Sequence, residues 1–300
     1  MSRIATVFVA TGLQGTSAIH ALLKDGTFKP RAVTRNAHSD SALALAALGC
    51  EVVEATFTDK EAIKRAVTGA ECVFLVTLPF QRDVPEYTQG VNVIEASKEA
   101  GVKFIAFSTL PGLKDISQGK YTKGALFDDK ADIQKYLEAS GISCASICPG
   151  SFVENVMRPV MSCNFEKADT GYVFSTREPL GYSYSWTWID RDMGPAVTAL
   201  FTQYTTRLPE INKKTFALGS QRMTAEEFAA TLSRGLGEPI QVKHLDNSGI
   251  DVAIEMYACV MEFDLSPWID VPDKRLEALG VRVGAIEDFA RTTLKEHLKA

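Results

Sequence analysis

The sequence predicts an α/β protein in which a doubly wound parallel sheet is followed by a smaller α+β C-terminal lobe. Short apolar runs alternate with helical patterns from the first residues to Pro149, which is the order of elements that builds a parallel sheet. The runs are almost continuously apolar, as expected for strands that are covered on both faces. After Pro149 the alternation stops, which indicates a change of architecture.

The elements of the N-terminal half follow from composition and periodicity. Its strands are short runs rich in apolar and β-branched residues, and its helices gather apolar residues on one face. In order, we expect strand Ile4–Val9, a helix ending near Lys24, strand Pro30–Thr34, helix Ser41–Leu48, strand Glu51–Glu54, helix Lys60–Val67, strand Cys72–Val76, helix Val84–Glu99, strand Phe104–Ser108, helix Asp128–Ser140 and strand Cys144–Cys148.

The C-terminal half is predicted to be less regular. Residues 151–187 are rich in aromatic residues and serine, and we expect an irregular segment there. Thr224 is expected to begin a helix, because Glu227 stands three residues later as in a capping box. The other expected elements are helix Asp190–Phe201, strand Thr215–Leu218, strand Ile240–His244, helix Ile250–Glu262 and helix Ile286–Lys299.

Composition narrows the class of protein. The formal net charge of −5 argues against nucleic-acid binding, because phosphate neutralisation needs clustered Lys and Arg. The six cysteines form no CxxC pair and the four histidines lie far apart, so we expect no metal site. Neither a secretory signal nor a membrane-spanning run is apparent. We therefore expect a cytoplasmic protein that has reduced thiols and no membrane partner.

Gly12 and Gly15 lie between the first strand and the first helix, as in the dinucleotide-binding loop of a Rossmann-type domain. The free amides at the start of that helix would bind a pyrophosphate. Val9 stands where a GxxGxxG motif has its first glycine, and a β-branched side chain is expected to exclude a positive φ there. The alternative interpretation is a tight strand–helix turn without a ligand.

Arg35 ends the second strand about 20 residues beyond the loop, where NAD-binding domains place an acid that holds the ribose diol. An arginine suits the 2′-phosphate of NADP(H), because its planar guanidinium offers paired donors. The alternative is a solvated arginine at a strand end. With the glycine loop, Arg35 favours NADP(H) over NAD(H). We interpret residues 1–152 as an NADP-binding Rossmann domain, with returns near residues 186–220, and residues 153–300 as a smaller substrate-binding lobe.

Several stretches together resemble the NmrA-like family of the atypical short-chain dehydrogenases and reductases. They are ATGLQG (10–15), RAVTRN (31–36), GAECVFLVT (69–77), EASKEAGVKFIAFSTLP (95–111), FDDKADIQKYLEASGI (127–142), ICPGSFVENV (147–156), WTWIDRDMGPAVTALF (186–201) and TAEEFAATLSRGLGEPI (224–240). The resemblance covers nearly the whole chain. It implies a Rossmann domain and a small lobe with NADP(H) in the crevice between them.

The resemblance also implies a role for each matching position. It places Thr11, Gly12, Leu13, Gln14 and Gly15 around the pyrophosphate, Arg35 and Asn36 with Thr34 at the adenosine 2′-phosphate, Thr77 and Leu78 at the adenosine ribose, Ser108, Thr109 and Lys130 at the nicotinamide ribose, and Pro149, Gly150, Ser151 and Phe152 along the nicotinamide. Three positions depart from the family pattern. Val9 replaces the loop glycine, Thr56 replaces an acid after the third strand, and Leu126 replaces the tyrosine of a YxxxK pair that ends at Lys130. The first two departures are expected to lower cofactor affinity.

Lys130 is the candidate catalytic residue, because Leu126 cannot donate a proton to a reduced substrate. A lysine in an apolar wall can have a lowered pKa and exchange protons. The alternatives are a purely structural ribose contact and a surface lysine paired with a carboxylate. Tyr121 and Lys123 are further donor candidates, for which ordinary loop solvation is the alternative.

Aromatic residues offer an apolar pocket for a large planar substrate. The candidate substrate-binding residues are Phe80, Tyr121, Phe127, Phe152, Asn155 and Trp186, together with Trp188. The alternative for each aromatic residue is packing between the lobes.

These residues support two classes of function. The first is an NADPH-dependent reductase of a hydrophobic carbonyl, quinone or imine, with a role in secondary metabolism. The second is a non-catalytic NADP(H) sensor that regulates transcription through a protein partner. A non-redox cyclase on the same fold is a further alternative.

Overall fold

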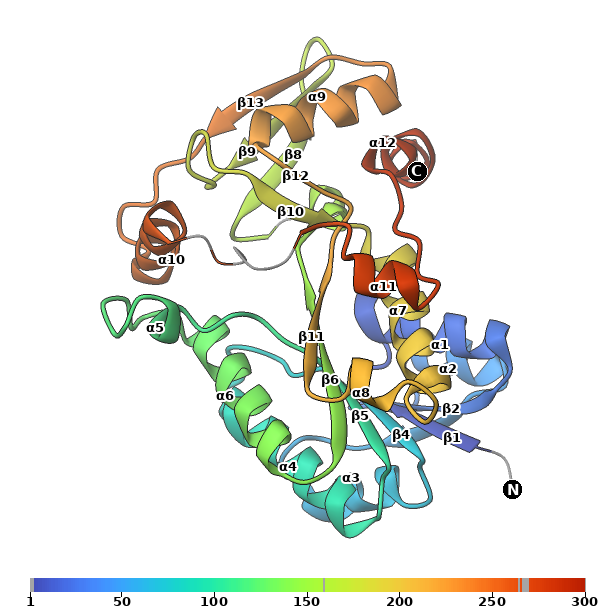
Figure 1. The fold of residues 1–300 in the computed structure, drawn as a ribbon. Coiled ribbons are helices and arrows are strands. Elements are labelled where there is room, and N and C mark those ends of the chain that lie inside the picture. Colours follow the sequence, from blue (N-terminus) through green and yellow to red (C-terminus); the bar gives the residue numbers. More distant parts are fainter. Residues whose placement is uncertain (1–2, 159, 264, 266–269, 300) are drawn as a thin grey trace.

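The computed structural model describes residues 3–158, 160–263, 265 and 270–299. Its centre is a seven-stranded sheet in the order β11-β6-β5-β4-β1-β2-β3 (Figure 1), in which every pair of neighbours is parallel. The strands are β1 (Arg3–Val7), β2 (Phe28–Thr34), β3 (Glu51–Glu54), β4 (Cys72–Leu75), β5 (Phe104–Ser108), β6 (Ser143–Pro149) and β11 (Lys214–Leu218). The predicted Rossmann-type sheet is therefore confirmed, and β3 and β5 have the predicted bounds.

Helices cover both faces of this sheet (Figure 1). They are α1 (Leu13–Asp25), α2 (Asp40–Ala47), α3 (Lys60–Val67), α4 (Glu86–Glu99), α5 (Leu113–Ile116), α6 (Ala125–Ala139), α7 (Ile189–Gln203), α8 (Leu208–Ile211) and α11 (Lys274–Ala278). Neighbouring strand residues point to opposite faces, so Phe74 packs with α1 and α7 while Val73 and Leu75 pack with α3, α4 and α6. The sheet thus separates two hydrophobic cores.

The small lobe corrects the expectation of an irregular segment over residues 151–187. That segment contains β7 (Ser151–Phe152), the 3₁₀ helix η1 (Val153–Met157), β8 (Cys163–Lys167), β9 (Tyr172–Thr176) and β10 (Tyr184–Thr187). With β12 (Gln221–Met223) and β13 (Ile240–His244), the strands β7 to β10 form two three-stranded sheets, ordered β12-β10-β7 and β13-β9-β8. These strands are only two to five residues long, which is too short for a period of two to stand out in the sequence.

The helices of the small lobe pack on these sheets. They are α9 (Ala225–Leu236), α10 (Asp251–Glu262), α12 (Ile286–Phe289), the π-helical η2 (Ala290–Leu294) and α13 (Lys295–His297). The predicted capping box is confirmed: the Glu227 amide donates to Thr224 Oγ1 at 3.2 Å, and the Thr224 amide donates to Glu227 Oε2 at 2.9 Å. In the core, Trp186 stacks on Phe228 with ring centroids 3.6 Å apart.

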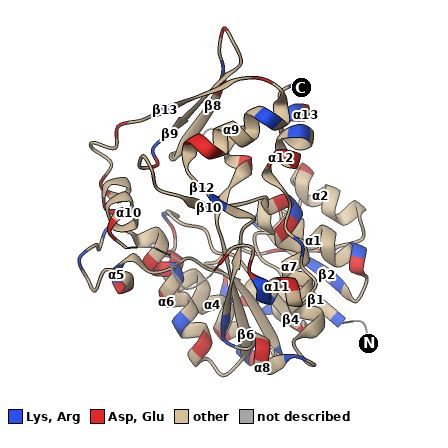
Figure 2. Cartoon of the chain, turned by 45° about the horizontal axis from the view of Figure 1, so that its top comes forward, with Lys and Arg blue, Asp and Glu red and all other residues tan. Residues whose placement is uncertain are grey.

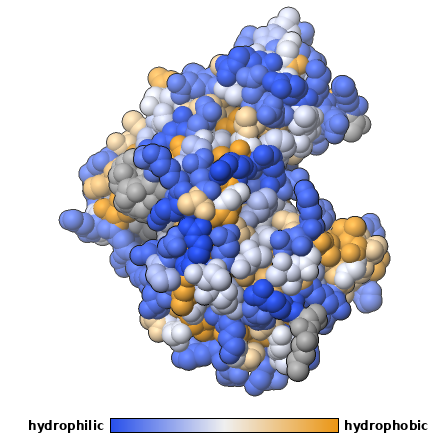
Figure 3. All heavy atoms as spheres, turned by 45° about the vertical axis from the view of Figure 1, so that its right-hand side comes forward, coloured by the Kyte–Doolittle hydropathy of each residue, from blue (hydrophilic) through white to orange (hydrophobic). Residues whose placement is uncertain are grey.

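The small lobe lies beyond the carboxyl ends of the parallel strands, because β6 leads directly into β7 and β11 leads into β12 (Figure 1). Gly150 lets the chain run from β6 into β7 close to β10, since a Cβ atom at this position would lie 2.1 Å from the Ser185 carbonyl oxygen. Figure 3 shows a hollow on one face between the two lobes. The carboxyl ends of parallel strands are where α/β proteins bind ligands.

The surface carries charges of both signs, with Lys and Arg interspersed among Asp and Glu along the helices (Figure 2). Among the residues that the structure describes, no helix is both long enough and apolar enough to cross a membrane. Within the same residues, no three His, Cys, Asp or Glu side chains gather in a metal-binding arrangement.

Gly194 provides a test of the packing between α1 and α7. A Cβ atom there would lie 2.2 Å from the Ser17 carbonyl oxygen and 2.7 Å from Ala21 Cβ. Gly194→Ala should therefore force the helices apart and lower the free energy of unfolding by about 1–3 kcal/mol, measured by urea denaturation. The exposed His20→Ala on α1 is the control and should change stability little. An unchanged Gly194→Ala midpoint would contradict this close packing.

Candidate nucleotide-binding and catalytic site

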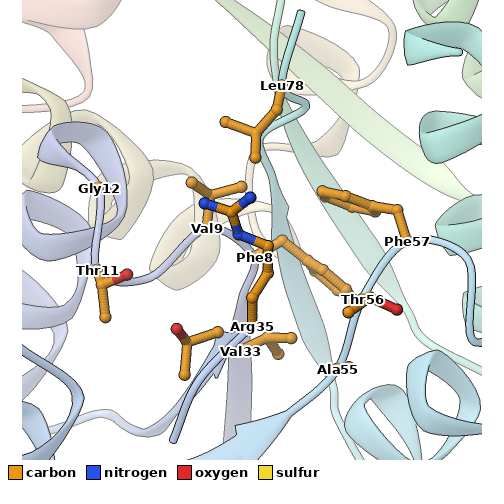
Figure 4. A pocket seen from close by; sticks show the side chains of 11 residues that line it. Phe8, Val9, Thr11, Gly12, Val33, Arg35, Ala55, Thr56, Phe57 and Leu78 are labelled. Atoms are coloured by element: carbon orange, nitrogen blue, oxygen red, sulfur yellow. The ribbon is translucent and has the colours of Figure 1, made fainter. Parts of the chain in front are cut away.

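A cavity of about 240 Å³ lies at the carboxyl ends of β1, β2, β3 and β4 (Figure 4). It is lined by Phe8, Val9, Thr11, Gly12, Val33, Thr34, Arg35, Ala55, Thr56, Phe57 and Leu78. In the sheet, β2 and β3 lie on one side of β1, and β4 lies on its other side. The cavity therefore opens at the point where the strand order reverses, which is the usual ligand site of a doubly wound sheet.

Gly15 holds the start of α1 against the end of β1. A Cβ atom at Gly15 would lie 2.3 Å from the Val9 carbonyl oxygen and 2.6 Å from Ala10 Cα. Both obstacles are backbone atoms, so a side chain could be accommodated only by displacing the helix. Thr16 Oγ1 reinforces the approach by donating to the Ala10 carbonyl at 3.1 Å.

Val9 corrects the expectation that a β-branched residue excludes a positive φ in this loop, since its φ is 52°. The Gly12 amide donates to the Val9 carbonyl at 2.9 Å, and the Ala10 amide donates to the Val33 carbonyl at 3.0 Å. The Val9 side chain also packs against the hydrophobic core. These contacts hold a conformation that costs a non-glycine residue roughly 1–2 kcal/mol, so the loop keeps its shape without the glycine.

The amino terminus of α1 is built to attract an anion. The first turn of α1 contains no acidic residue and, among the described residues, no side chain accepts from its amides. The amides of Leu13, Gln14 and Gly15 have no acceptor within the helix, and the helix dipole adds partial positive charge. Ser108 Oγ donates to Gln14 Oε1 at 2.7 Å, which ties this turn to the end of β5.

Arg35 is the only charged side chain among the described residues that line the cavity. It is exposed, its guanidinium lies in the middle of the view in Figure 4, and its Nη1 lies 3.5 Å from Gln81 Oε1. Thr56 takes the place of an acid and contacts Thr58 Oγ1 at 2.9 Å. Asn36 accepts from the His38 amide and does not line the cavity. The site can therefore hold a second anionic group at Arg35.

Lys130 lies in α6 and is buried against the segment that follows β4. Its Nζ donates to Glu86 Oε1 and, at 3.0 Å, to Thr77 Oγ1. Burial lowers the pKa of Lys130, while the carboxylates of Glu86 and Asp129 act in the opposite direction. Thr77 Oγ1 itself donates to Glu86 at 2.7 Å. Sequence reasoning missed Glu86, whose signal was an acid directly after Pro85 at a helix start.

The segment after β6 links the two lobes. Pro149 is the last residue of β6, and Ser151 and Phe152 are half-buried in β7. The Gly150 amide donates to Thr187 Oγ1 at 2.8 Å. Glu154 is buried and its Oε1 accepts from the Asp190 amide at 2.8 Å, so this carboxyl group fastens the segment to the start of α7.

The predicted substrate-binding residues are not all placed in one pocket. Trp186 is a correction: it is 2% exposed, stacks on Phe228 and donates through Nε1 to the Met223 carbonyl, so it belongs to the core of the small lobe. Phe80 is 67% exposed and has a φ of 58°. Phe127 and Asn155 are half-buried, and the amide oxygen of Asn155 accepts from Arg158.

Tyr121 and Lys123 belong to a contact between the lobes. Tyr121 Oη donates to Glu262 Oε2 at 2.8 Å, and Lys123 Nζ pairs with Asp251 at 2.8 Å. Glu255 Oε2 accepts from the amides of Thr122 and Lys123, both at 2.7 Å. These acids lie on α10, which therefore bridges to the loop between α5 and α6 (Figure 1).

Comparison with known proteins agrees with this geometry. A sequence model described as the NmrA-like family matches residues 1–266. The chain is 28% identical over 280 residues to the NmrA-like family domain-containing oxidoreductase malD of Malbranchea aurantiaca, covering 86% of this chain and 80% of malD. Several other curated relatives match over about half of their own length.

Solved structures show the same fold. NmrA, a negative transcriptional regulator solved in complex with NADP, superposes with a TM-score of 0.81 at 17% identity, covering 100% of this chain and 98% of that chain. The NADPH-dependent quinone oxidoreductase QOR2 of Escherichia coli, complexed with NADPH, superposes with a TM-score of 0.67 at 22% identity, covering 99% of this chain and 100% of that chain. The shared fold thus occurs in a regulator and in an enzyme.

Glu154 makes stability depend on pH, because burial raises its pKa from 4.5 to about 7. Above pH 4.5 the unfolded chain releases this proton while the folded protein retains it, so folding loses stability as pH rises through this window. The glutamine side chain of the Glu154→Gln variant cannot titrate. The unfolding free energy of this variant minus that of wild type should therefore increase by up to about 3 kcal/mol as the pH rises from 5 to 8.

Urea denaturation at a series of pH values checks this expectation. The exposed Glu296→Gln is the control and should follow the wild-type curve. A constant difference between Glu154→Gln and wild type across this range would show that Glu154 does not titrate in this way.

Proposed function

Because the chain belongs to the NmrA-like family, we propose that it binds NADP(H) and reduces a hydrophobic carbonyl, quinone or imine substrate. The observation that carries the proposal is the cavity that joins the unobstructed amino terminus of α1 to Arg35. The resemblance expected from the sequence is confirmed by the family match. The activity and the substrate class are our inference.

The residues around the cavity have the chemistry that NADP(H) requires. The amides of Leu13, Gln14 and Gly15 would hold the pyrophosphate, and Gly12 would let the backbone approach it. Arg35 would pair with the 2′-phosphate through a charge-assisted contact. Phe8 and Phe57, whose ring centroids lie 6.0 Å apart, together with Leu78 offer an apolar surface for the adenine.

The carboxyl ends of β5 and β6 would hold the nicotinamide half. Ser108 ends β5 and Thr109 follows it, and Ser151 and Phe152 follow β6 on the side of the small lobe. Bound NADPH would supply a hydride, which an enzyme exploits by holding the acceptor above the nicotinamide. Lys130 would then donate the proton that the reduced oxygen or nitrogen needs. A half-buried Phe127 would favour an apolar acceptor.

A regulatory role is the second candidate, and a specific observation favours it. Leu126 has no hydroxyl group, and Lys130 Nζ already has three acceptors within hydrogen-bonding distance, Glu86 Oε1 and the hydroxyl and carbonyl oxygens of Thr77. A protein that binds NADP(H) without turnover could report the NADP/NADPH ratio to a protein partner. Such a protein should bind the two forms with different affinities and should reduce none of the acceptors.

Arg35→Met tests cofactor recognition. Removing the guanidinium should weaken NADPH binding about 10- to 100-fold, since a hydrogen bond to a charged group contributes roughly 1.5–3 kcal/mol. NADH lacks the 2′-phosphate and should bind the variant as it binds wild type. Calorimetric titration measures the Kd of NADPH and of NADH, and the distant, exposed Arg291→Met is the control. Equal losses for NADPH and NADH would contradict the assignment of Arg35.

Lys130→Met tests the proton donor. Wild type should oxidise NADPH in the presence of at least one acceptor from a panel of aldehydes, quinones and imines. The variant should lose about 100-fold or more in kcat, because general acid catalysis typically contributes 10²–10⁴-fold. NADPH affinity should change much less than kcat. Tight NADPH binding by wild type without reduction of any acceptor would favour the regulatory function instead.

A further inference from the structure

The Lys130 amine is held by two side chains to which the proposed reaction gives no role. Nζ donates to Glu86 Oε1 and, at 3.0 Å, to Thr77 Oγ1. Thr77 Oγ1 donates to the same oxygen of Glu86 at 2.7 Å. Glu86 is the first residue of α4, Lys130 lies in α6, and Thr77 follows β4. Three separate parts of the chain therefore meet at one amine.

Burial makes the two charges depend on each other. The side chain of Glu86 is 2% exposed and that of Lys130 is 10% exposed. An unpaired charge in such a place is strongly disfavoured, and removing one partner leaves the other uncompensated. Glu86 also lies at the amino terminus of α4, where the helix dipole favours a negative charge. The local structure thus supports a carboxylate beside an ammonium group.

The pair retains unused hydrogen-bonding capacity. An ammonium group has three N–H donors, and Lys130 Nζ has three acceptors: Glu86 Oε1, Thr77 Oγ1 at 3.0 Å and the Thr77 carbonyl oxygen at 3.4 Å. Glu86 Oε2 is buried and has no partner among the residues that the structure describes. A pair that served only to join α4 to α6 would have no need of a buried acceptor without a partner. The 3.4 Å contact with the Thr77 carbonyl oxygen is long for a hydrogen bond, so its donor is the one that a substrate oxygen or nitrogen can take over.

We propose that Glu86 is the positioning residue for Lys130: it holds the amine at the end of β4 and keeps a proton on it. This inference rests on the proposed function. During reduction of a carbonyl, the carbon accepts a hydride from NADPH, which becomes NADP⁺. The C=O π electrons move onto the oxygen, which takes a proton from the Lys130 ammonium, and the neutral amine regains a proton from water. Glu86 stabilises the ammonium before transfer and after reprotonation.

Two carboxylates act on the Lys130 amine, Glu86 from α4 and Asp129 from α6 itself. Glu86→Gln keeps the shape of the side chain and removes its charge, so the amine should bind its proton about tenfold more weakly, a fall of about one pKa unit. Glu95→Gln on the same helix is the matched control. It changes a contact with Tyr136 Oη and leaves the pair intact.

The primary measurement is a pH titration of the Lys130 amine by NMR with ¹⁵Nζ-labelled lysine, in which Lys130→Met identifies the signal. The midpoint should fall by about one unit in Glu86→Gln and stay at the wild-type value in Glu95→Gln. With an acceptor present, Glu86→Gln should lower kcat about tenfold, while KM for NADPH changes little. The decrease of kcat at alkaline pH should also begin at a lower pH in this variant than in wild type. A purely structural role would leave this pH profile unchanged.

The outcomes separate the two proposals. An unchanged NMR midpoint in Glu86→Gln would overturn the role of Glu86, even if wild type proves to be an active reductase. A lowered midpoint would support that role, even if the acceptor panel shows no turnover and the reductase proposal fails. If Glu86→Gln does not fold, Glu86→Asp replaces it. Its shortened carboxylate should lower kcat and shift the midpoint part of the way, and a wild-type midpoint would again overturn the role.

Discussion

The structure depends on one close contact, between Gly15 at the start of α1 and the backbone of Val9 and Ala10. A Cβ atom at Gly15 would lie 2.3 Å from a carbonyl oxygen, so only glycine lets the helix begin at the end of β1. This contact aims the free amides of α1 at the cavity between β1 and β4. At Gly194 a second close contact lets α7 pack on α1, and α7 brings the chain back from the small lobe to the large sheet.

A second constraint is the buried pair of Lys130 and Glu86. In the proposed function, the glycine contact would define where the phosphates of a dinucleotide lie, and the buried pair would define where a proton is delivered. The pair and the Gln89 side chain, which bonds to both the amide and the carbonyl of Leu78, hold the segment after β4. That segment supplies Leu78 to the cavity wall and Thr77 to the pair. The proposed cofactor site and the proposed proton donor therefore share one short stretch of chain.

The sequence predicted most elements of the large sheet, because strands such as β4 (CVFL) and β5 (FIAFS) are almost wholly apolar and the main helices have an apolar face. Three features escaped it for physical reasons. Val9 adopts a positive φ because its tertiary contacts outweigh its local preference. Glu86 resembles an ordinary acid at a helix start until the fold brings Lys130 to it. Trp186 packs on Phe228, a partner far away in the sequence, so its burial could not be distinguished from a place in a substrate pocket.

The most direct test of the account is a crystal structure of the protein with NADPH. The account predicts pyrophosphate oxygens within hydrogen-bonding distance of the amides of Leu13, Gln14 and Gly15. It also predicts the 2′-phosphate at the Arg35 guanidinium and the nicotinamide beside Phe152. A dinucleotide bound elsewhere, or one whose 2′-phosphate points away from Arg35, would contradict it.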